Sequence, residues 1–457
     1  MSEIIQNKKN YLTAVQRRHS IRYLLSCVAV GFVGSVCISS TVISLLALKL
    51  GAGEMFLGWM TFLWLAPQVF GMITLPHIEY KGKKRVLFFW YAMCAVLAMG
   101  FMAIPFLAIY TSKFFVLAYT LIIIGAVSIS GALAWTGWFP LLQDIVPARL
   151  MGRFFGNFRT GWQIAGLIST LSLAFFMGKD APWWKFQLIF CIAASAFAIR
   201  ALCILKAHEN PPQKTYAQRS SIKKLLVEFI KEKANYPMIA YIATYAIAVG
   251  MCEPFKIKLL RDLGYSDSFI IYTAAMTNIG GIVSLRYWGR IADRFGNRCI
   301  LSITSASMIF ITLAWVFIND ATANTAFANY LIFGLYFLLS IFNCGNGIVQ
   351  TRFIMQTIPV SKQPQVTLVN HLMLILWGIA SVIGGFALKS LEGLELNLGF
   401  TKLDNYQMLF AFVAILFTIP LAIRHNLKMD KDKTTKEVMA IMMRPLIGQL
   451  SARRYKK

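Results

Sequence analysis

The stretch that decides the fold is YWGRIADRFGNRCI, from Tyr287 to Ile300. It gathers three arginines and one aspartate between long apolar runs, although only 14% of the chain is charged. Two glycines, Gly289 and Gly296, frame the charges. Such a short polar segment between apolar runs is typical of a loop that joins two hydrophobic helices.

The composition places these helices in a membrane. Hydrophobic residues make up 58% of the 457 residues, and the mean hydropathy is +0.62. A soluble core of this length could not bury so much apolar surface, so lipid must be the solvent. The net charge of +26 falls in short bursts between apolar segments, which argues against a nucleic-acid-binding face.

Twelve apolar runs are long enough to cross a bilayer as helices, which needs ~20 residues each. They cover residues 23–48, 55–75, 86–108, 114–138, 156–178, 184–205, 237–255, 268–286, 299–318, 328–349, 367–389 and 405–424. Strands of a membrane barrel are shorter and alternate in polarity. We therefore predict an all-α polytopic membrane protein.

The lysines and arginines fall mainly on one side of these spans, which predicts cytoplasmic N- and C-termini in a cell (inner or plasma) membrane. The predicted organisation is a cytoplasmic segment (1–22), a six-helix bundle (23–205), a cytoplasmic linker with an amphipathic helix (206–236), a second six-helix bundle (237–424) and a basic cytoplasmic tail (425–457).

An internal repeat relates the two bundles. Matching residues recur at a nearly constant separation after spans one and seven, two and eight, and four and ten. The pairs are Gly51 with Gly264, Gly82 with Gly296, and Pro147 with Pro359. We therefore expect two pseudo-symmetric halves in parallel orientation.

The segment GRIADRFGNR resembles the loop motif of the major facilitator superfamily. The matching positions are Gly289, Ile291, Ala292, Asp293, Arg294, Gly296 and Arg298, whereas Asn297 replaces a usual basic residue. The first-half copy is eroded, with Leu75 and Glu79 in place of the glycine and the aspartate. The resemblance implies twelve helices as two six-helix bundles that expose a central site to each side in turn.

A cytoplasmic gate is the functional interpretation of this loop. Asp293 could cap a neighbouring helix or pair with an arginine across the halves, and Gly289, Arg294, Gly296 and Arg298 are the other gate candidates in the same loop. Glu79, Asp144 and Arg153 could contribute at the corresponding first-half loops. The alternatives are that the arginines only set topology, and that the loop around Asp144 is a plain solvated turn.

In the superfamily, spans one, four, seven and ten line a central cavity, so polar or aromatic residues there and on neighbouring spans are candidates for the solute site. The candidates are Gln68, Trp135, Trp138, Gln163, Tyr241, Tyr245, Tyr336, Asn343, Asn346 and Gln350. The serines of span one, including Ser35, Ser39, Ser40 and Ser44, are interpreted instead as contacts that hold helices together.

Two residues could couple transport to protons. Glu253 is the acid inside a predicted span, but Pro254 directly after it suggests that the helix ends or kinks there, and the depth of Glu253 suggests that it is interfacial. His371 titrates near neutrality, although a satisfied core histidine is the commoner case.

The sequence predicts a secondary transporter for a small organic solute, not an enzyme. Aromatic rings beside amides favour an uncharged, sugar-like solute over a cation. A multidrug or amphiphile exporter, or a receptor or regulator on the same fold, remains the alternative. We expect a monomer in the bilayer, protons or sodium as coupling ion, and neither nucleic acid nor cofactor. The eight cysteines have no metal-ligand spacing, so no metal is expected.

Overall fold

The computed structural model describes residues 12–73, 82–146, 151–209, 227–229, 231–357, 363–397, 402–424 and 427. Within these ranges, eleven helical segments are long and apolar enough to cross a membrane, and Gly161–Met177 forms a twelfth, shorter apolar stretch. Each predicted span coincides with one of them. The all-α polytopic prediction is confirmed.

The first half of the chain builds six of these segments, several of which are broken by short 3-10 turns. Their elements are α2 (Ala14–Cys37), α3 (Ser40–Lys49), α4 (Glu54–Leu65), η1 (Ala66–Phe70), α6 (Lys83–Gly100), η2 (Phe101–Ala103), α7 (Ile104–Tyr110), α8 (Lys113–Trp135), α9 (Trp138–Ile145), α10 (Met151–Met177) and α11 (Trp183–Leu205).

The second half repeats this plan with longer helices. Its elements are η4 (Lys233–Asn235), α13 (Tyr236–Asp262), α14 (Asp267–Phe295), α15 (Asn297–Ala314), η5 (Trp315–Phe317), α16 (Ala326–Thr357), α17 (Gln363–Ser390), α18 (Asn405–Leu416) and α19 (Thr418–Ile423). Two short antiparallel strands, β1 (Leu396–Asn397) and β2 (Lys402–Leu403), join α17 to α18 outside the helices.

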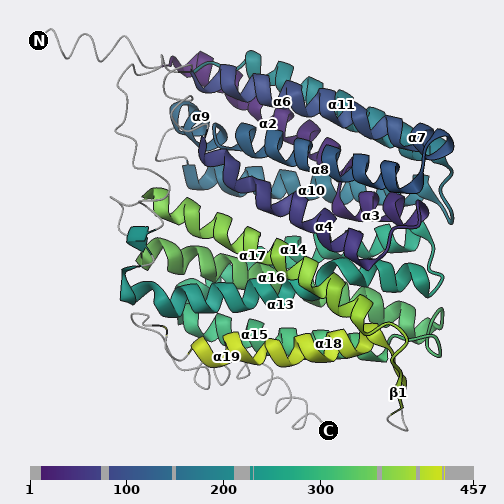
Figure 1. The fold of residues 1–457 in the computed structure, drawn as a ribbon. Coiled ribbons are helices and arrows are strands. Elements are labelled where there is room, and N and C mark those ends of the chain that lie inside the picture. The colour runs from purple at the N-terminus through teal and green to yellow at the C-terminus, as the bar shows by residue number, and fades with distance from the viewer. Residues whose placement is uncertain are drawn as a thin grey trace, which may run out of the picture.

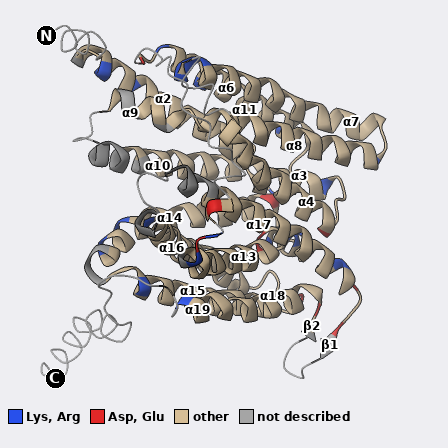
Figure 2. Cartoon of the chain, turned by 60° about the vertical axis from the view of Figure 1, so that its left-hand side comes forward, with Lys and Arg blue, Asp and Glu red and all other residues tan. Residues whose placement is uncertain are grey.

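The two halves lie side by side with their helices roughly parallel to one another (Figure 1). Helix α2 begins and α19 ends at the same end of the bundle, and we call the opposite end the distal end. Charged residues gather mainly near the two ends, whereas the helices between them are largely uncharged (Figure 2). This distribution suits a protein whose middle lies in hydrocarbon.

The internal repeat is visible in the backbone. Gly51 and Gly264 both have positive φ, at 76° and 79°. Gly82 and Gly296 do too, at 92° and 88°, and each immediately precedes a helix. Glycine adopts this conformation without the penalty that other residues incur. The third pair, Pro147 and Pro359, lies outside the described residues.

Helix α13 extends beyond its predicted end at residue 255 and continues through Pro254 to Asp262. A proline removes the N–H that would bond the carbonyl four residues earlier. Here Ser381 of α17 compensates, because its hydroxyl donates to the Gly250 carbonyl oxygen at 2.9 Å. A neighbouring helix therefore allows the proline inside a continuous span.

The most extensive contacts between the halves are those of α4 with α17 and of α10 with α14. Close approach in the first pair depends on glycine. A Cβ atom on Gly58 would lie 2.6 Å from the Ser381 carbonyl oxygen, and one on Gly385 would lie 2.9 Å from the Glu54 carbonyl oxygen. Small residues at such crossings allow backbones to pack directly in a membrane.

Replacing Gly58 with alanine should therefore destabilise the protein by about 2 kcal/mol, since the new methyl group overlaps backbone atoms. The matched control is Gly334→Ala on α16, where no atom lies within 4 Å of the added carbon. That variant should be neutral or slightly more stable because alanine favours helix. Thermal unfolding of the purified proteins measures both, and equal unfolding temperatures would contradict the close crossing.

Candidate solute site between the two halves

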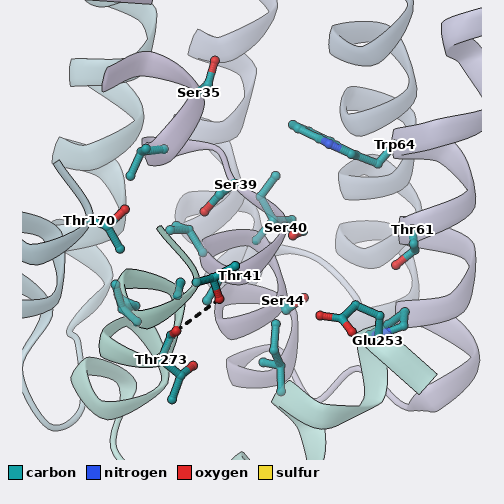
Figure 3. A pocket seen from close by; sticks show the side chains of 18 of the residues that line it. Ser35, Ser39, Ser40, Thr41, Ser44, Thr61, Trp64, Thr170, Glu253 and Thr273 are labelled. Atoms are coloured by element: carbon teal, nitrogen blue, oxygen red, sulfur yellow. Dashed lines mark hydrogen bonds between the residues drawn. The ribbon is translucent and has the colours of Figure 1, made fainter. Parts of the chain in front are cut away.

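A cavity of about 410 Å³ lies between the halves. Helices α2, α3, α4 and α10 wall it from the first half, and α13, α14, α16 and α17 from the second. Hydroxyl groups dominate its polar surface (Figure 3). They belong to Ser35, Ser39, Ser40, Thr41, Ser44, Thr61, Thr170, Thr273, Thr277 and Tyr336.

A break in the first membrane segment forms part of this wall. Helix α2 ends at Cys37 and α3 begins at Ser40, with Ser39 extended between them (φ −63°, ψ 158°). The Ser39 side chain makes no capping hydrogen bond to α3. Non-helical backbone at membrane depth is tolerated where it lines a polar cavity. The break thus presents backbone polar groups of α3 to the cavity.

Glu253 lies in the cavity wall, not at a helix end as predicted from Pro254. Figure 3 shows its carboxylate pointing toward Ser44. Lys256, one turn further along α13, donates to that carboxylate at 2.6 Å and is only 1% exposed. The ammonium group also lies 5.6 Å from the centroid of the Trp315 ring. An ion pair between a buried lysine and a half-buried glutamate therefore borders the cavity.

A second cavity of about 210 Å³ adjoins the first, because Ser35 and Trp64 line both. Its wall also contains Gln68, Trp135 and Arg200. The Gln68 amide donates to the Ser128 hydroxyl at 3.4 Å, and that hydroxyl donates to the Trp64 carbonyl at 2.7 Å. With Tyr91 of α6, polar groups of five first-half segments thus line this cavity.

The sequence-predicted candidates divide between these cavities and the helix interiors. Tyr336 lines the central cavity, and Trp135 and Gln68 line the second. The others are in neither wall: Trp138, Gln163, Tyr241, Tyr245, Asn343, Asn346 and Gln350. Trp138 is 1% exposed and packs in the first-half core.

The amides of α16 are absent from the walls because they bond within the second half. The Asn346 amide donates to the Tyr241 hydroxyl at 2.8 Å, and Gln350 donates to Asn346. The Tyr245 hydroxyl donates to Asn343 at 2.7 Å. In this structure the amides therefore bond other side chains of their own half, and the span-one serines line the cavity.

The remaining candidates are placed as follows. His371 is half-buried on α17, outside both cavity walls, and its ring Nδ1 has no hydrogen-bond partner among the described residues.

Gly296 separates α14 from α15, and Gly289 and Arg298 lie on those two helices. The backbones of Asp144, Arg153, Asp293 and Arg294 are helical, but their side chains lie outside the described part, as does all of Glu79. The cytoplasmic gate therefore stays a prediction.

At the distal end, charged groups join the two halves. Asp267, at the start of α14, accepts from Arg261 at 2.6 Å and from the backbone N–H of Ala181 in the other half at 3.0 Å. Asp180 pairs with Lys49 at 3.2 Å and with Arg261 at 3.5 Å. We call these five residues the distal clamp.

A second link at this end runs from Lys258 of α13 to Glu54 of α4, at 3.1 Å. Lys258 also pairs with Asp262 at 2.8 Å. Within the clamp, the hydrogen bond from Lys49 lowers the pKa of Asp180 below its ordinary value. The structure therefore holds the halves together at the distal end of the cavity.

The wall residues that the sequence-based candidates missed include Arg200, Thr273 and Trp377. An arginine in the middle of an apolar run was a usable signal, since charges inside membrane spans mark functional sites. Thr273 and Trp377 gave no such signal, because threonine and tryptophan are common in packed helices.

Within the described residues, twelve apolar helical segments form two halves with a solute-sized cavity between them, an architecture typical of secondary transporters. The chain belongs to the Major Facilitator Superfamily, whose family model matches residues 23–385. No curated protein sequence matches the chain.

Solved structures share the fold at low sequence identity. The nucleoside transporter NupG is 14% identical, with a TM-score of 0.65 over 89% of this chain and 98% of that one. A D-xylose-proton symporter is 12% identical, with a TM-score of 0.63 over 89% and 97%. A bacterial homologue of the iron transporter ferroportin, in an inward-facing state, is 12% identical, with a TM-score of 0.65 over 91% and 99%.

Proposed function

We propose that this protein moves a small hydroxylated organic solute across a membrane by alternating access. The observation that carries the proposal is the central cavity, whose wall is shared by both halves. A site between two halves becomes accessible from either side when the halves rock around it. The distal clamp would then have to open in each cycle.

The wall chemistry supports a hydroxylated solute. Serine and threonine hydroxyls both donate and accept hydrogen bonds, so they match sugar-like hydroxyl groups. Trp64, Tyr336 and Trp377 add aromatic surface for packing against C–H groups. At about 410 Å³, the cavity is near the lower end of the ~300–1,000 Å³ range of small-molecule sites, which favours a small solute.

Protons are the proposed coupling ion, and Glu253 is the proposed carrier. Its carboxylate lines the cavity beside Lys256, so gain of a proton would release the lysine and change the charge next to the solute. One protein of the same fold is a D-xylose-proton symporter. We further propose that the distal end faces away from the cytoplasm, as the lysine and arginine distribution predicts.

Flux into reconstituted vesicles tests the transport function. Purified protein should catalyse saturable uptake of at least one radiolabelled compound from a panel of sugars, nucleosides, sugar acids and sugar phosphates. Protein-free vesicles and vesicles with heat-denatured protein are the controls. If the native protein moves no member of any class, the receptor or regulator alternative replaces the transporter.

A further inference from the structure

We infer that the second cavity binds an anionic group of the solute through the guanidinium of Arg200. The inference rests on the proposed transport function and adds charge to the solute class. It also revises the sequence-based preference for an uncharged solute.

Within the described part of the chain, Arg200 is a buried cation with no acid beside it. The residue is 8% exposed on α11, and its Nη2 donates to the Tyr91 hydroxyl at 2.8 Å. The Tyr91 ring also packs 4.0 Å from the guanidinium carbon. Nε has no hydrogen-bond partner, and no carboxylate among the described residues forms an ion pair with Arg200.

The Cys27 thiol also lies within hydrogen-bonding reach of the guanidinium, but neither Tyr91 nor Cys27 supplies an acid that balances its charge. A guanidinium has five N–H donors and a full positive charge, whereas a tyrosine hydroxyl is one neutral acceptor. An uncompensated charge inside a membrane segment is costly and marks substrate or ion pathways. The fold also reserves space for it, because a Cβ on Gly31 of α2 would lie 2.4 Å from Arg200 Cδ.

A second feature favours negative charge nearby. The break at Ser39 places the N-terminus of the ten-residue helix α3 at the central cavity, without a side-chain cap. The first N–H groups of a helix carry partial positive charge and attract anions. The carboxylate of Glu253 does not cancel this field, since Lys256 neutralises it.

The two adjoining cavities point to the ligand class. Ser35 and Trp64 line both, so one solute can contact the hydroxyl wall while its charged group lies near Arg200. Carboxylate and phosphate groups both match the planar fork of arginine. The geometry points to a hydroxylated organic anion, either a sugar acid or a sugar phosphate.

Ligand-dependent thermal unfolding tests this without requiring transport. The purified full-length protein is titrated with glucuronate, glucose 6-phosphate, inorganic phosphate and neutral glucose at constant ionic strength. We expect at least one organic anion to raise the unfolding temperature more than glucose does. Whether glucuronate or the phosphate ester gives the larger shift identifies the group.

Variants assign the effect to Arg200. Arg200→Gln should weaken the apparent affinity for the anion roughly 10- to 100-fold, because a charge-assisted hydrogen bond is lost. Arg286→Gln removes an equal charge from an exposed position on α14 and should match the wild type. If Arg200→Gln does not fold, Gly31→Ala keeps the charge but displaces the guanidinium, and it should weaken binding too.

Equal anion-dependent shifts in the wild type and the Arg200 or Gly31 variant would overturn the inference. So would a wild-type protein that no anion stabilises beyond the effect of glucose. Vesicle flux separates the two proposals, since saturable uptake of neutral sugars alone leaves the transporter standing and removes the anion site.

Discussion

Replacing Glu253 with glutamine is expected to abolish proton-driven accumulation of the solute while leaving solute exchange across the membrane. Glutamine has nearly the same shape as glutamate but has no carboxylate that could carry a proton. The cavity wall would therefore keep its form and lose the titrating group. Uptake into vesicles with an imposed pH gradient, compared with exchange at equal pH, measures the two activities separately.

The same substitution should also destabilise the protein by about 3 kcal/mol, because it leaves the Lys256 ammonium buried without its partner. Lys256 is 1% exposed, so water cannot replace the carboxylate. The double variant Glu253→Gln with Lys256→Met removes both charges and should recover most of the stability. It should not recover accumulation. Full pH-driven accumulation by either variant would exclude Glu253 as the proton carrier.

Replacing Asp267 with asparagine is expected to open the distal end. The Asp267 carboxylate is nearly fully buried and bonds both Arg261 and the Ala181 backbone in the other half. Loss of one charge-assisted hydrogen bond, about 1.5–3 kcal/mol, would raise the population of distal-open protein roughly 10- to 100-fold.

The measurement uses Ser40→Cys, in the cavity wall, in a background where the exposed Cys191 is replaced by serine. A membrane-impermeant maleimide added on the distal side should label this cysteine correspondingly faster.

The matched control is Asp404→Asn at the start of α18. Asp404 is also a distal acid, but its carboxylate accepts from Tyr406 and Gln407 within the second half. Asparagine is an equally good helix cap, so this variant should label as slowly as the parent. Equal rates for the Asp267 and Asp404 variants would show that the clamp does not hold the distal end closed.

The fold could be predicted almost completely from the sequence because lipid imposes few options on the backbone. Long apolar runs had to be helices, and the paired glycines at Gly82 and Gly296 revealed the repeat from their spacing alone. The end of α13 was mispredicted for a reason that lies outside its own sequence. The carbonyl freed by Pro254 is bonded by Ser381, more than a hundred residues away.

The site was less predictable because a polar residue in a membrane helix can either bond a neighbouring helix or line a cavity. The sequence pattern is the same in both cases. Asn346 and Ser40 both lie on helices where a polar face was evident. Asn346 forms hydrogen bonds with Tyr241 and Gln350 within its own half. Ser40 instead follows the helix break in the cavity wall. Whether such a residue bonds another helix or lines the cavity depends on which helix packs against it. A single sequence does not specify that packing.

The two helices of the first membrane segment, α2 and α3, pack against different halves of the protein. Helix α2 packs against α10 and α11, whereas α3 contacts α13 and α14, and Ser39 alone lies extended between the two pieces. Any rotation of one half against the other must therefore strain this short joint. In the proposed transport cycle the solute would contact Ser39 and its neighbours, so solute binding should change how easily the backbone rotates at this joint.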